Sequence, residues 1–469
     1  MPATLQNFGR NVSFAPSASY APRTEAELLD IMTRHRGEKI RVHGSLHSWS
    51  EVAATTGVAL DLRFFDQVRV EREGDRVYAM VGAGCRIKRV LSELRGSADL
   101  TLPTIGVIDE QTLVGAAATG THGSGRHCLS HFVVSVTVAV YDPVSDEAVL
   151  RTFDSGPELE AARCSLGCMG VIVSLRIRVR PQYRVEEHFA VHDRLSDVLA
   201  AEDRFPLQQA YLLPWAWRYF TQHRREIAAP RSRLAGAYRG YCFTILDVGL
   251  HVAVLAVTRM LRSARLTRLF YRRLAPAMIP RGWRVVERSD RQLTMEHDLF
   301  RHIEIELFVT RSCLNEALAF LRAVLCFVAS PSAALPPEIA AHLLEMGHVE
   351  DLQALKGSYT HHYPICLRRV EPDETLISMT SGGEEARYAI SLISYARQGD
   401  RGPFVRLAEL LTVSMGGLFQ ARPHWGKVCP VDRALAASLC PRLDQFRRLC
   451  GSVDPKGRFR NDWVSRVLF

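Results

Sequence analysis

The segment GAAATGTHGSG, residues 115–125, constrains the fold most, because small side chains run through it almost without interruption. A backbone with so little side-chain bulk allows a large flat ligand to approach closely, and Thr119, Thr121 and Ser124 offer hydroxyl partners. The spacing is neither GxGxxG nor that of the phosphate loop ending in Gly-Lys-Ser/Thr, so neither a Rossmann nor a nucleoside-triphosphatase fold is indicated. The alternative is a tightly packed helix and turn.

Three further segments have the composition of a ligand site. GSLHS, residues 44–48, follows a predicted strand, where glycine lets the backbone turn and aim its N–H groups at an anion; an ordinary turn is the alternative. SLGCMGVIV, residues 165–173, places two glycines before a strand, which also suits close backbone approach. PHWGK, residues 423–427, ends in a lysine that either stands beside an anionic ligand or is solvated.

The periodicity of the chain predicts strands and helices in mixture. Residues 171–179 alternate apolar side chains with Ser174, Arg176 and Arg178, which is typical of a strand with one buried face, and Pro181 closes it. Thr24 and Glu27 form a capping box that predicts a helix start. Further strands are expected over 39–44, 57–62, 75–84, 132–142, 302–309, 375–379 and 388–396, and a further helix over 86–94.

These elements predict an α+β protein of two domains. We place the first over residues 1–182, the second over 183–420, and a C-terminal segment, 421–469, that is too short to fold alone and returns to the first domain. In the second domain, Glu304 and Glu306 share one face of their strand.

Composition excludes several classes of protein. With 469 residues, 47% hydrophobic and 23% charged, the chain is an ordinary globular protein, and its net charge of +9 suits anionic partners without choosing among them. No zinc-finger spacing or aromatic-rich RNA-binding signature is present, so no nucleic acid is expected, and no metal site is predicted. The eleven cysteines contain no CxxC pair and the N-terminus has no signal-peptide pattern, which together predict a reducing cytoplasm.

One region raises the question of a membrane. The most apolar run, residues 243–257, is interrupted by Asp247 and His251 and is shorter than a confident membrane span. Five arginines then recur at helical spacing among leucines, at positions Arg259, Arg262, Arg265, Arg268 and Arg272. This pattern predicts either a soluble helix with a solvated basic face or a helix lying peripherally on an acidic membrane surface.

The order of these motifs resembles a known family. GTHGSG, HWGK and the late DPKGRFRN together are similar to the aldonolactone and alditol oxidases of the vanillyl-alcohol-oxidase flavoprotein superfamily, over most of the first 180 residues and the last fifty. The resemblance implies a vanillyl-alcohol-oxidase-like (PCMH-type) FAD-binding domain and a mixed-sheet substrate-binding cap domain. It also implies that FAD lies on the two small-residue loops and that His47, in GSLHS, bonds covalently to a methyl carbon of the flavin ring.

The resemblance assigns the remaining site residues by position. Lys427 and His424 of HWGK would lie at the flavin and substrate, Arg368 would contact substrate oxygen, and Thr112 replaces a substrate-binding serine. Gly106 matches a gate where a relative has alanine, so oxygen should reach the flavin. The residues expected to contact the cofactor are Gly44, Ser45, Leu46, His47, Ser48, Gly106, Gly115, Thr119, Thr121, His122, Gly123, Ser124, Gly125, Gly170 and Ile172.

One departure from the family pattern concerns the substrate. The glutamate expected two residues before Arg368 is replaced by Cys366, whose thiol, with a reference pKa of about 8.5, cannot accept the same hydrogen bonds as a carboxylate. Cys366 is either part of an altered substrate site or simply buried and inert. Glu306 could supply an acid instead, although a surface carboxylate is the leading interpretation of that residue.

Three functions follow from the resemblance. The leading one is an FAD-dependent oxidase of a CH–OH group in a polyol, sugar lactone or related small hydroxylated substrate, with hydride transfer to flavin N5 and reoxidation by oxygen to give hydrogen peroxide. The second keeps the flavin but passes electrons to a quinone or protein acceptor at a membrane. The third is a flavin-binding redox module that has lost catalysis.

Overall fold

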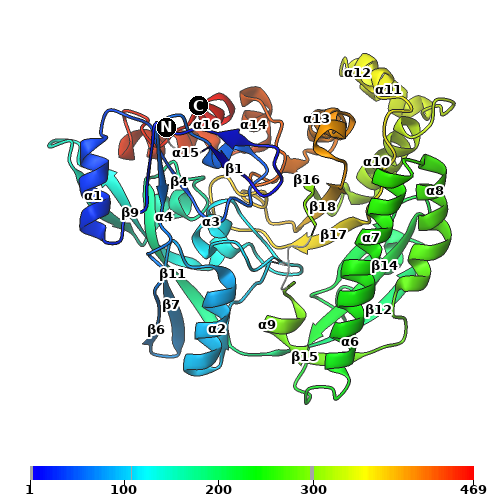
Figure 1. The fold of residues 1–469 in the computed structure, drawn as a ribbon, viewed down its shortest axis with the longest axis horizontal. Coiled ribbons are helices and arrows are strands. Elements are labelled where there is room, and N and C mark those ends of the chain that lie inside the picture. Colours follow the sequence, from blue (N-terminus) through cyan, green and yellow to red (C-terminus); the bar gives the residue numbers. More distant parts are fainter. Residues whose placement is uncertain (1–3, 107, 296–299) are drawn as a thin grey trace.

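The chain folds around two antiparallel sheets that lie side by side (Figure 1). The computed structural model describes residues 4–106, 108–295 and 300–469. The smaller of the two sheets has six strands, in the order β10 (Ala148–Phe153), β9 (Val133–Tyr141), β11 (Val171–Pro181), β7 (Arg76–Gly82) and β6 (Val68–Glu73), with β8 (Leu100–Thr101) beside β11.

A small parallel sheet and several helices complete this half of the molecule. Its strands are β3 (Ala18–Tyr20), β5 (Val58–Asp61) and β4 (Ile40–His43); β1 (Leu5–Gln6) and β2 (Ser13–Phe14) pair separately. The predicted capping box begins α1 (Glu25–Arg34), since the Thr24 side chain accepts the Glu27 N–H. The other helices here are η1 (Glu51–Ala53), α2 (Ile87–Ala98), α3 (Leu113–Ala118), η2 (Leu129–Phe132) and α4 (Gly156–Arg163).

Residues 433–469 pack on this same half, whereas Arg422 and Pro423 belong to the larger sheet. They form α14 (Arg433–Leu439), α15 (Leu443–Val453) and α16 (Asp462–Leu468). Their buried side chains, among them Phe446, Phe459 and Trp463, belong to the hydrophobic core that holds the six-stranded sheet. The two ends of the chain therefore build one unit, as Figure 1 shows by the blue and red segments lying together.

The larger sheet has eight strands. Their order is β15 (Val285–Arg288), β12 (Arg184–His192), β14 (Arg218–Glu226), β13 (Gln209–Leu213), β17 (Ile365–Val370), β18 (Arg387–Ser394), β16 (Ile303–Thr310) and β19 (Arg422–Pro423). Ile305 and Leu307 of β16 face a core shared with α10 (Leu314–Val328) and α13 (Gly402–Phe419). Because side chains alternate along a strand, Glu304 and Glu306 face the opposite way, toward the other half of the molecule.

Shorter helices surround this sheet. They are α5 (Leu195–Ala200), α9 (Ser289–Gln292), α11 (Pro337–Glu345), α12 (Val349–Ala354) and η7 (Gln398–Asp400). The strand predicted over 375–379 is wrong, because that segment is a loop. Its hydroxyl groups bind a buried carboxylate instead of a strand ladder: Thr375 Oγ1 and Ser378 Oγ donate to Asp373 at 2.6 and 2.7 Å.

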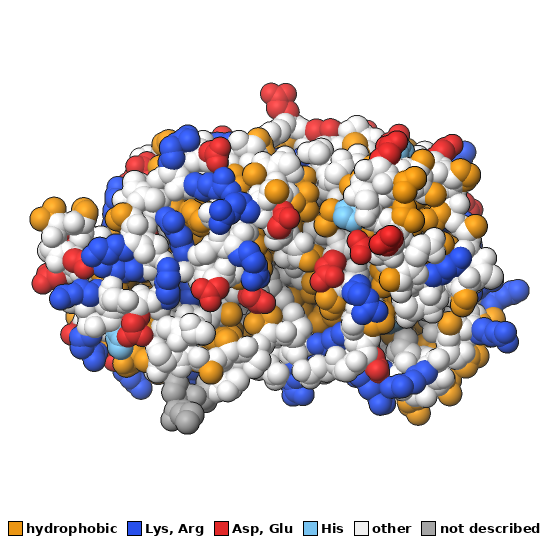
Figure 2. Space-filling model, turned by 90° about the horizontal axis from the view of Figure 1, so that it is seen from above, with side chains coloured by type: hydrophobic (Ala, Val, Ile, Leu, Met, Phe, Trp, Pro, Cys, Tyr) orange, Lys and Arg blue, Asp and Glu red, His pale blue; other side chains and the backbone are white. Residues whose placement is uncertain are grey.

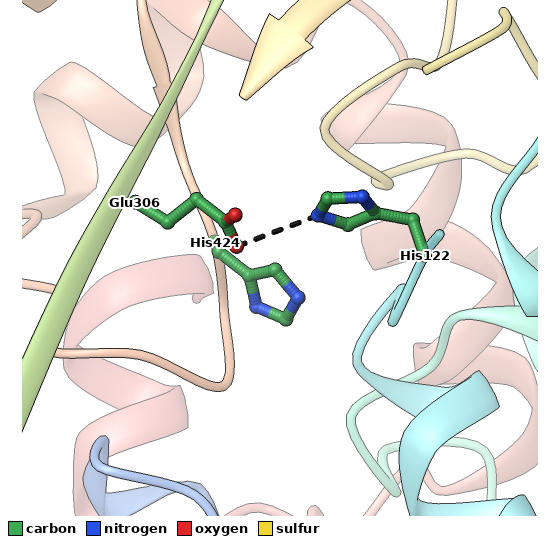
Figure 3. A group of neighbouring side chains, drawn as sticks. All are labelled: His122, Glu306 and His424. Carbon is green, nitrogen blue, oxygen red and sulfur yellow. Dashed lines mark ion pairs between the residues drawn. The ribbon is translucent and has the colours of Figure 1, made fainter. Parts of the chain in front are cut away.

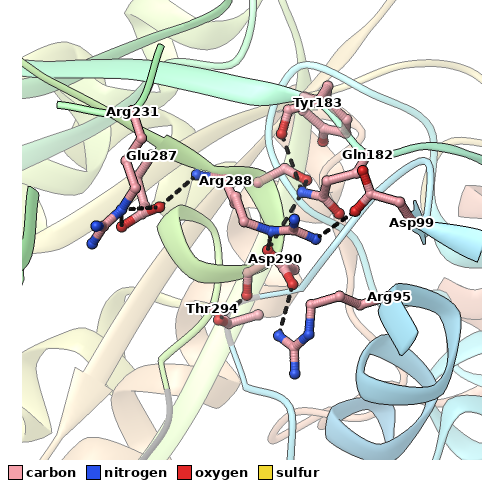
Figure 4. Close-up of polar contacts among 10 residues, drawn as sticks. Arg95, Asp99, Gln182, Tyr183, Arg231, Glu287, Arg288, Asp290 and Thr294 are labelled. Carbon is pink, nitrogen blue, oxygen red and sulfur yellow. Dashed lines mark hydrogen bonds and ion pairs between the residues drawn. The ribbon is translucent and has the colours of Figure 1, made fainter.

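Arginine–carboxylate pairs join the two halves at the lower edge of the molecule. Arg95 of α2 contacts Asp290 of α9 at 3.0 Å, and Arg288 of β15 contacts Asp99 at 3.0 Å (Figure 4). These pairs tie the end of the first sheet to the edge of the second, so the space between the two sheets has a fixed lower border.

A helical hairpin packs on one face of the larger sheet, over β12, β14 and β13 (Figure 1). Its first arm runs from Ala235 to Met260 and consists of α6 (Ala235–Tyr241), η3 (Cys242–Gly249), α7 (Leu250–Leu255) and η4 (Ala256–Met260). Its second arm consists of α8 (Ala264–Leu269), η5 (Phe270–Leu274) and η6 (Ala275–Met278). The first arm is long and apolar enough to cross a membrane by length and composition, which the sequence did not predict.

Candidate active site

A cavity of about 680 Å³ lies between the two halves and collects most of the predicted site residues. Figure 2 shows a hollow between the two sides of the molecule. The loops of the first half line one side of the cavity, and strands of the larger sheet form the other. A volume of this size accommodates a large cofactor ring together with a substrate.

The loop of residues 44–48 turns directly after β4 and lines the cavity throughout. Position 44 favours glycine, since a Cβ there would lie 2.5 Å from the Thr112 hydroxyl. The C-terminal segment fixes the end of the loop, because Ser48 Oγ donates to the Gly426 carbonyl at 3.1 Å. Leu46, at φ +54°, adopts the left-handed conformation at the tip of the turn.

The small-residue segment divides into two parts. Thr112 caps α3 by accepting the Gly115 N–H, and the stretch from Gly115 to His122 contributes Gly115, Thr119, Thr121 and His122 to the cavity wall. Gly106 also lines the cavity and packs on Thr121.

Three residues of the same segment, Gly123, Ser124 and Gly125, are not among those that line the cavity. Ser124 Oγ donates to the Gln208 carbonyl, and the Gly125 N–H donates to the Arg369 carbonyl at 2.7 Å. They attach the loop to the larger sheet, so their small size serves close packing between the two halves.

The third glycine segment stands beside a buried arginine that the sequence analysis missed. Gly170, at φ +119°, and Ile172 line the cavity as predicted. Arg41 of β4 also lines it, while its guanidinium donates to the Phe459 and Leu166 carbonyls at 2.6 and 2.7 Å. Arg41 alternates with apolar neighbours on a strand, which could have signalled a buried cation.

One cross-strand row forms the floor of the cavity. Tyr211 of β13 pairs with Cys366 of β17, Cys366 pairs with Ser391 of β18, and Ser391 pairs with Glu306 of β16. Cys366 is buried, and burial raises the pKa of its thiol, so the thiol stays neutral. Arg368, two residues along, lines the cavity in the same direction.

The interpretation of Glu306 as a surface carboxylate is wrong. Its exposed fraction is 2%, its Oε2 lies 3.4 Å from Nε2 of His122, and its Oε1 accepts the Ser391 hydroxyl at 2.6 Å. Burial by itself raises the pKa of Glu306, but His122, Lys427 and His424 outweigh it and hold that pKa well below its usual range. The signal was present in the sequence, since Glu304 and Glu306 alternate with apolar residues.

The HWGK motif lies at the edge of the same floor. Lys427 lines the cavity, and its Nζ contacts the Glu304 carboxylate at 2.5 Å and lies 4.5 Å above the Trp49 ring. His424 is buried, and burial lowers its pKa to about 3. Its Nδ1 accepts the Gly426 N–H at 2.9 Å, so the neutral ring carries its proton on Nε2.

His122, Glu306 and His424 converge from three different elements (Figure 3). Their ligand-type atoms lie within 4.8 Å of one another, a spacing that a metal ion would also tolerate. However, Lys427 and Arg368 line the same cavity, and their positive charges oppose a divalent cation.

His47 is packed against an aromatic ring at the cavity wall. Its ring stacks on Phe8, with centroids 5.0 Å apart and an interplanar angle of 10°. Burial is the main cause that lowers its pKa to about 4, so the imidazole is neutral at pH 7. A neutral ring nitrogen retains the lone pair that a nucleophile needs.

These residues fit FAD. The first half supplies bare backbone and hydroxyls for the dinucleotide, at positions where an added methyl at Gly44 or Gly115 would meet Thr112. The neutral imidazole of His47 and the cations Lys427 and Arg368 suit an electron-accepting ring that gains negative charge.

Comparison with known proteins identifies the family. The sequence model of a family described as D-arabinono-1,4-lactone oxidase matches residues 176–467, and that of an FAD binding domain matches residues 16–142. A long-chain alcohol oxidase of an uncultured marine euryarchaeote is 50% identical over 99% of this chain and 97% of its own. The L-gulono-1,4-lactone dehydrogenase of Mycobacterium tuberculosis is 26% identical over 97% of this chain and 96% of its own.

The fold is likewise shared with a solved structure. A solvent-stable cholesterol oxidase superposes with a TM-score of 0.75 at 16% identity, over 98% of this chain and 96% of that chain. The predicted resemblance and the α+β fold class are confirmed. The chain therefore belongs to the D-arabinono-1,4-lactone oxidase family, whose FAD-dependent enzymes oxidise CH–OH groups.

Proposed function

We propose that the protein is an oxidase of long-chain alcohols. The observation that carries this proposal is the chemistry of the cavity floor, where Cys366 stands in the position of the family's acid. Around it, Tyr211, Tyr363, Tyr395 and Ile393 line the cavity with aromatic and aliphatic surface. A polyol or sugar lactone needs several hydrogen-bond partners, whereas an alkyl chain needs apolar surface and one polar end.

The relative with 50% identity, a long-chain alcohol oxidase, supports the same substrate class. Glu306, His122 and Arg368 provide a polar end in the cavity. We place the hydroxyl group there and the alkyl chain along the tyrosines, toward His251 of the helical hairpin.

The residues predicted to hold FAD keep that role in this proposal, with the ring tethered through His47. Bound FAD supplies the acceptor for the carbinol hydrogen and its electron pair. The neutral state of His47 supports the tether, since only the unprotonated imidazole can bond to carbon. Lys427 and Arg368 stabilise the negative charge that the reduced ring gains.

The proposed electron acceptor, oxygen rather than a membrane acceptor, depends on the small size of Gly106. A Cβ on this residue would lie 2.9 Å from the Thr121 methyl, so glycine keeps the space between the Gly106 backbone and Thr121 free of a side chain. We propose that oxygen is the acceptor and that hydrogen peroxide is the second product. The alternative, electron transfer to a membrane acceptor, predicts product without peroxide.

We further propose that the helical hairpin rests on an acidic membrane surface. Eight of the thirteen exposed large hydrophobic side chains among the described residues lie on it or directly before it: Leu234, Phe243, Val252, Met260, Leu261, Leu266, Leu269 and Leu274. Arg262, Arg265, Arg272 and Arg273 are exposed beside them. This combination suits a helix that buries leucines among acyl chains and places arginines at lipid phosphates.

The basic pattern itself differs from the prediction of one continuous helix. The chain breaks between the two arms at Arg262, whose φ is +46°. Arg259 and Arg268 turn inward and donate to the carbonyls of Tyr395 and Ala329, and Nε of Arg272 donates to the Trp215 carbonyl at 3.2 Å. The first arm packs its buried His251 and Val254 on the protein, which supports a helix lying on a bilayer surface over one passing through it.

This geometry connects the membrane with the substrate. His251 lines the cavity from the inner face of the first arm, and its Nε2 lies 2.7 Å from the Tyr395 hydroxyl. A long-chain alcohol dissolved in the bilayer would therefore enter beside the hairpin.

All eleven cysteines are unpaired, which supports the reducing side of the membrane, the cytoplasm, as the location.

The membrane proposal is tested with vesicles. Leu261, Leu269 and Leu274 are each more than half exposed, so burying each in lipid contributes about 1 kcal/mol. Replacing all three with serine should weaken binding to vesicles containing one-third phosphatidylglycerol by about 100-fold. A control that replaces the distant exposed Leu344 with serine should bind unchanged. Equal binding of the triple variant would contradict the proposal.

The substrate proposal is tested by a chain-length series. Purified holoenzyme is offered primary alcohols of increasing length, together with L-gulono-1,4-lactone and a sugar polyol, while oxygen uptake and peroxide are measured. We expect kcat/KM to rise by about tenfold for every two methylenes until the apolar surface is filled, because each buried CH2 contributes about 0.8 kcal/mol. Turnover of the lactone or polyol with no gain along the series would overturn the proposal.

A further inference from the structure

The cavity contains a carboxylate–imidazole pair, Glu306 and His122, although the leading interpretation of the sequence made Glu306 a surface carboxylate. The acid expected in this family would stand at position 366, where this chain has a thiol. The row Cys366–Ser391–Glu306 crosses three neighbouring strands, so a carboxylate reappears two strands away on the same face of the sheet. We propose that Glu306, together with His122, accepts the proton of the substrate hydroxyl.

The hydrogen bonds around the pair define where a proton can be held. Nδ1 of His122 lies 2.9 Å from the Gly123 carbonyl, which can only accept, so Nδ1 carries a proton and donates it there. Nε2 then faces Oε2 of Glu306 at 3.4 Å. If neither atom carried a proton, the lone pairs of Nε2 and Oε2 would face each other and repel. The space between these two atoms is therefore suited to hold one further proton. The other oxygen, Oε1, is occupied by the Ser391 hydroxyl at 2.6 Å.

The charges that face the pair favour its proton-accepting form. Lys427 and the neutral His424 come from the segment after β19, and Arg368 comes from β17. Glu304, on β16 with Glu306, is paired with Lys427. Burial lowers the pKa of Arg368, but Cys366 and Glu306 raise it, and the guanidinium remains a cation. Two cations beside Glu306 stabilise the state in which the shared proton is absent and the pair carries one negative charge.

The proton and electrons then balance. The hydroxyl proton of the alcohol moves to the Glu306–His122 pair and fills the position between Oε2 and Nε2. The carbinol hydrogen leaves with its electron pair to FAD, which is the oxidant, and the product is the aldehyde. The pair returns its proton to solvent before the next turnover. This assignment rests on the oxidation of a hydroxyl group in this cavity, and it does not depend on the length of the alkyl chain.

The test combines Glu306→Gln with a matched control. Glutamine keeps the size of the side chain and can still accept the Ser391 hydroxyl, but it cannot take up a proton. We expect flavin reduction by the alcohol to slow at least 100-fold, a typical loss for a general base. We also expect the rise of kcat/KM with pH, which reports loss of the shared proton in the wild type, to disappear. The control is Glu202→Gln, a buried carboxylate paired with Arg311 at 2.6 Å outside the cavity.

A second variant and a binding measurement separate catalysis from folding. His122→Gln removes proton exchange but keeps a polar group, and we expect a loss of about tenfold with a displaced pH profile. A tertiary long-chain alcohol, which has no carbinol hydrogen, should bind Glu306→Gln holoenzyme within about fivefold of the wild type, measured by calorimetry. Since this binding involves no turnover, an unchanged affinity shows that the cavity is intact.

Two outcomes would overturn the inference. The first is a Glu306→Gln variant that keeps more than one-tenth of the wild-type rate and the same pH profile. The second is loss of activity in a chelator with recovery on adding a divalent metal, which would make the three converging side chains a metal site. If the wild type instead oxidises the lactone but no long-chain alcohol, the proposed substrate fails, and the same variants are measured with the lactone.

Discussion

The ion pair between Lys427 and Glu304 leads to a prediction about two variants, in which the second recovers stability without recovering activity. Both side chains are largely buried, with exposed fractions of 17% and 8%, and their charged atoms lie 2.5 Å apart. Lys427→Met keeps the apolar stem beside Trp49 but leaves the Glu304 carboxylate buried without its cation. Breaking a buried pair in this way costs about 3 kcal/mol or more, since the remaining charge has lost both water and partner.

The double variant Lys427→Met with Glu304→Gln removes that remaining charge. We expect it to regain at least half of the lost stability, measured as the urea midpoint of the holoenzyme. Both variants should have low activity, because the positive charge beside the flavin is absent from both. Flavin reduction should be at least 100-fold slower in each than in the wild type. A double variant no more stable than the single one would refute this reasoning, as would a single variant with wild-type stability.

Three further predictions concern the flavin. His47→Ala should move the yellow colour from the pellet to the supernatant after acid precipitation; colour in the wild-type supernatant would contradict the tether. Gly106→Ala should slow reoxidation by oxygen about tenfold, with an artificial acceptor unaffected, since the added methyl would meet Thr121 at 2.9 Å; unchanged oxygen consumption would exclude the gate. Gly44→Ala should lower flavin content, because its Cβ would lie 2.5 Å from the Thr112 hydroxyl; full occupancy would count against that loop as the cofactor cradle.

The local patterns predicted individual strands and helices. Alternation over residues 171–179 gave the strand β11, and the capping box at Thr24 gave the start of α1. Pattern alone misled at residues 375–379, where apolar residues suggest a strand but Asp373 collects the neighbouring hydroxyls into a loop. The acceptor lies just two residues before the segment, so the apolar pattern within residues 375–379 misled because it left out the neighbouring carboxylate.

The site was predictable as far as it lies in contiguous motifs. The loops at 44–48 and 115–122 and the HWGK motif could be placed at one cavity because a family order was recognisable. The contacts of Glu306 were not predictable, since its partners His122 and Ser391 are 184 and 85 residues away along the chain. The Lys427–Glu304 pair and the inward turn of Arg259 were not predictable for the same reason, because both depend on contacts between segments that are distant along the chain.

The most direct test of the central claim is anaerobic mixing of the purified holoenzyme with a long-chain primary alcohol while the flavin absorbance is followed. The account predicts that the flavin bleaches in a single turnover, that admitted oxygen restores the colour with one equivalent of hydrogen peroxide, and that L-gulono-1,4-lactone at the same concentration bleaches it far more slowly. A flavin that stays oxidised with the alcohol but bleaches with the lactone would contradict the account.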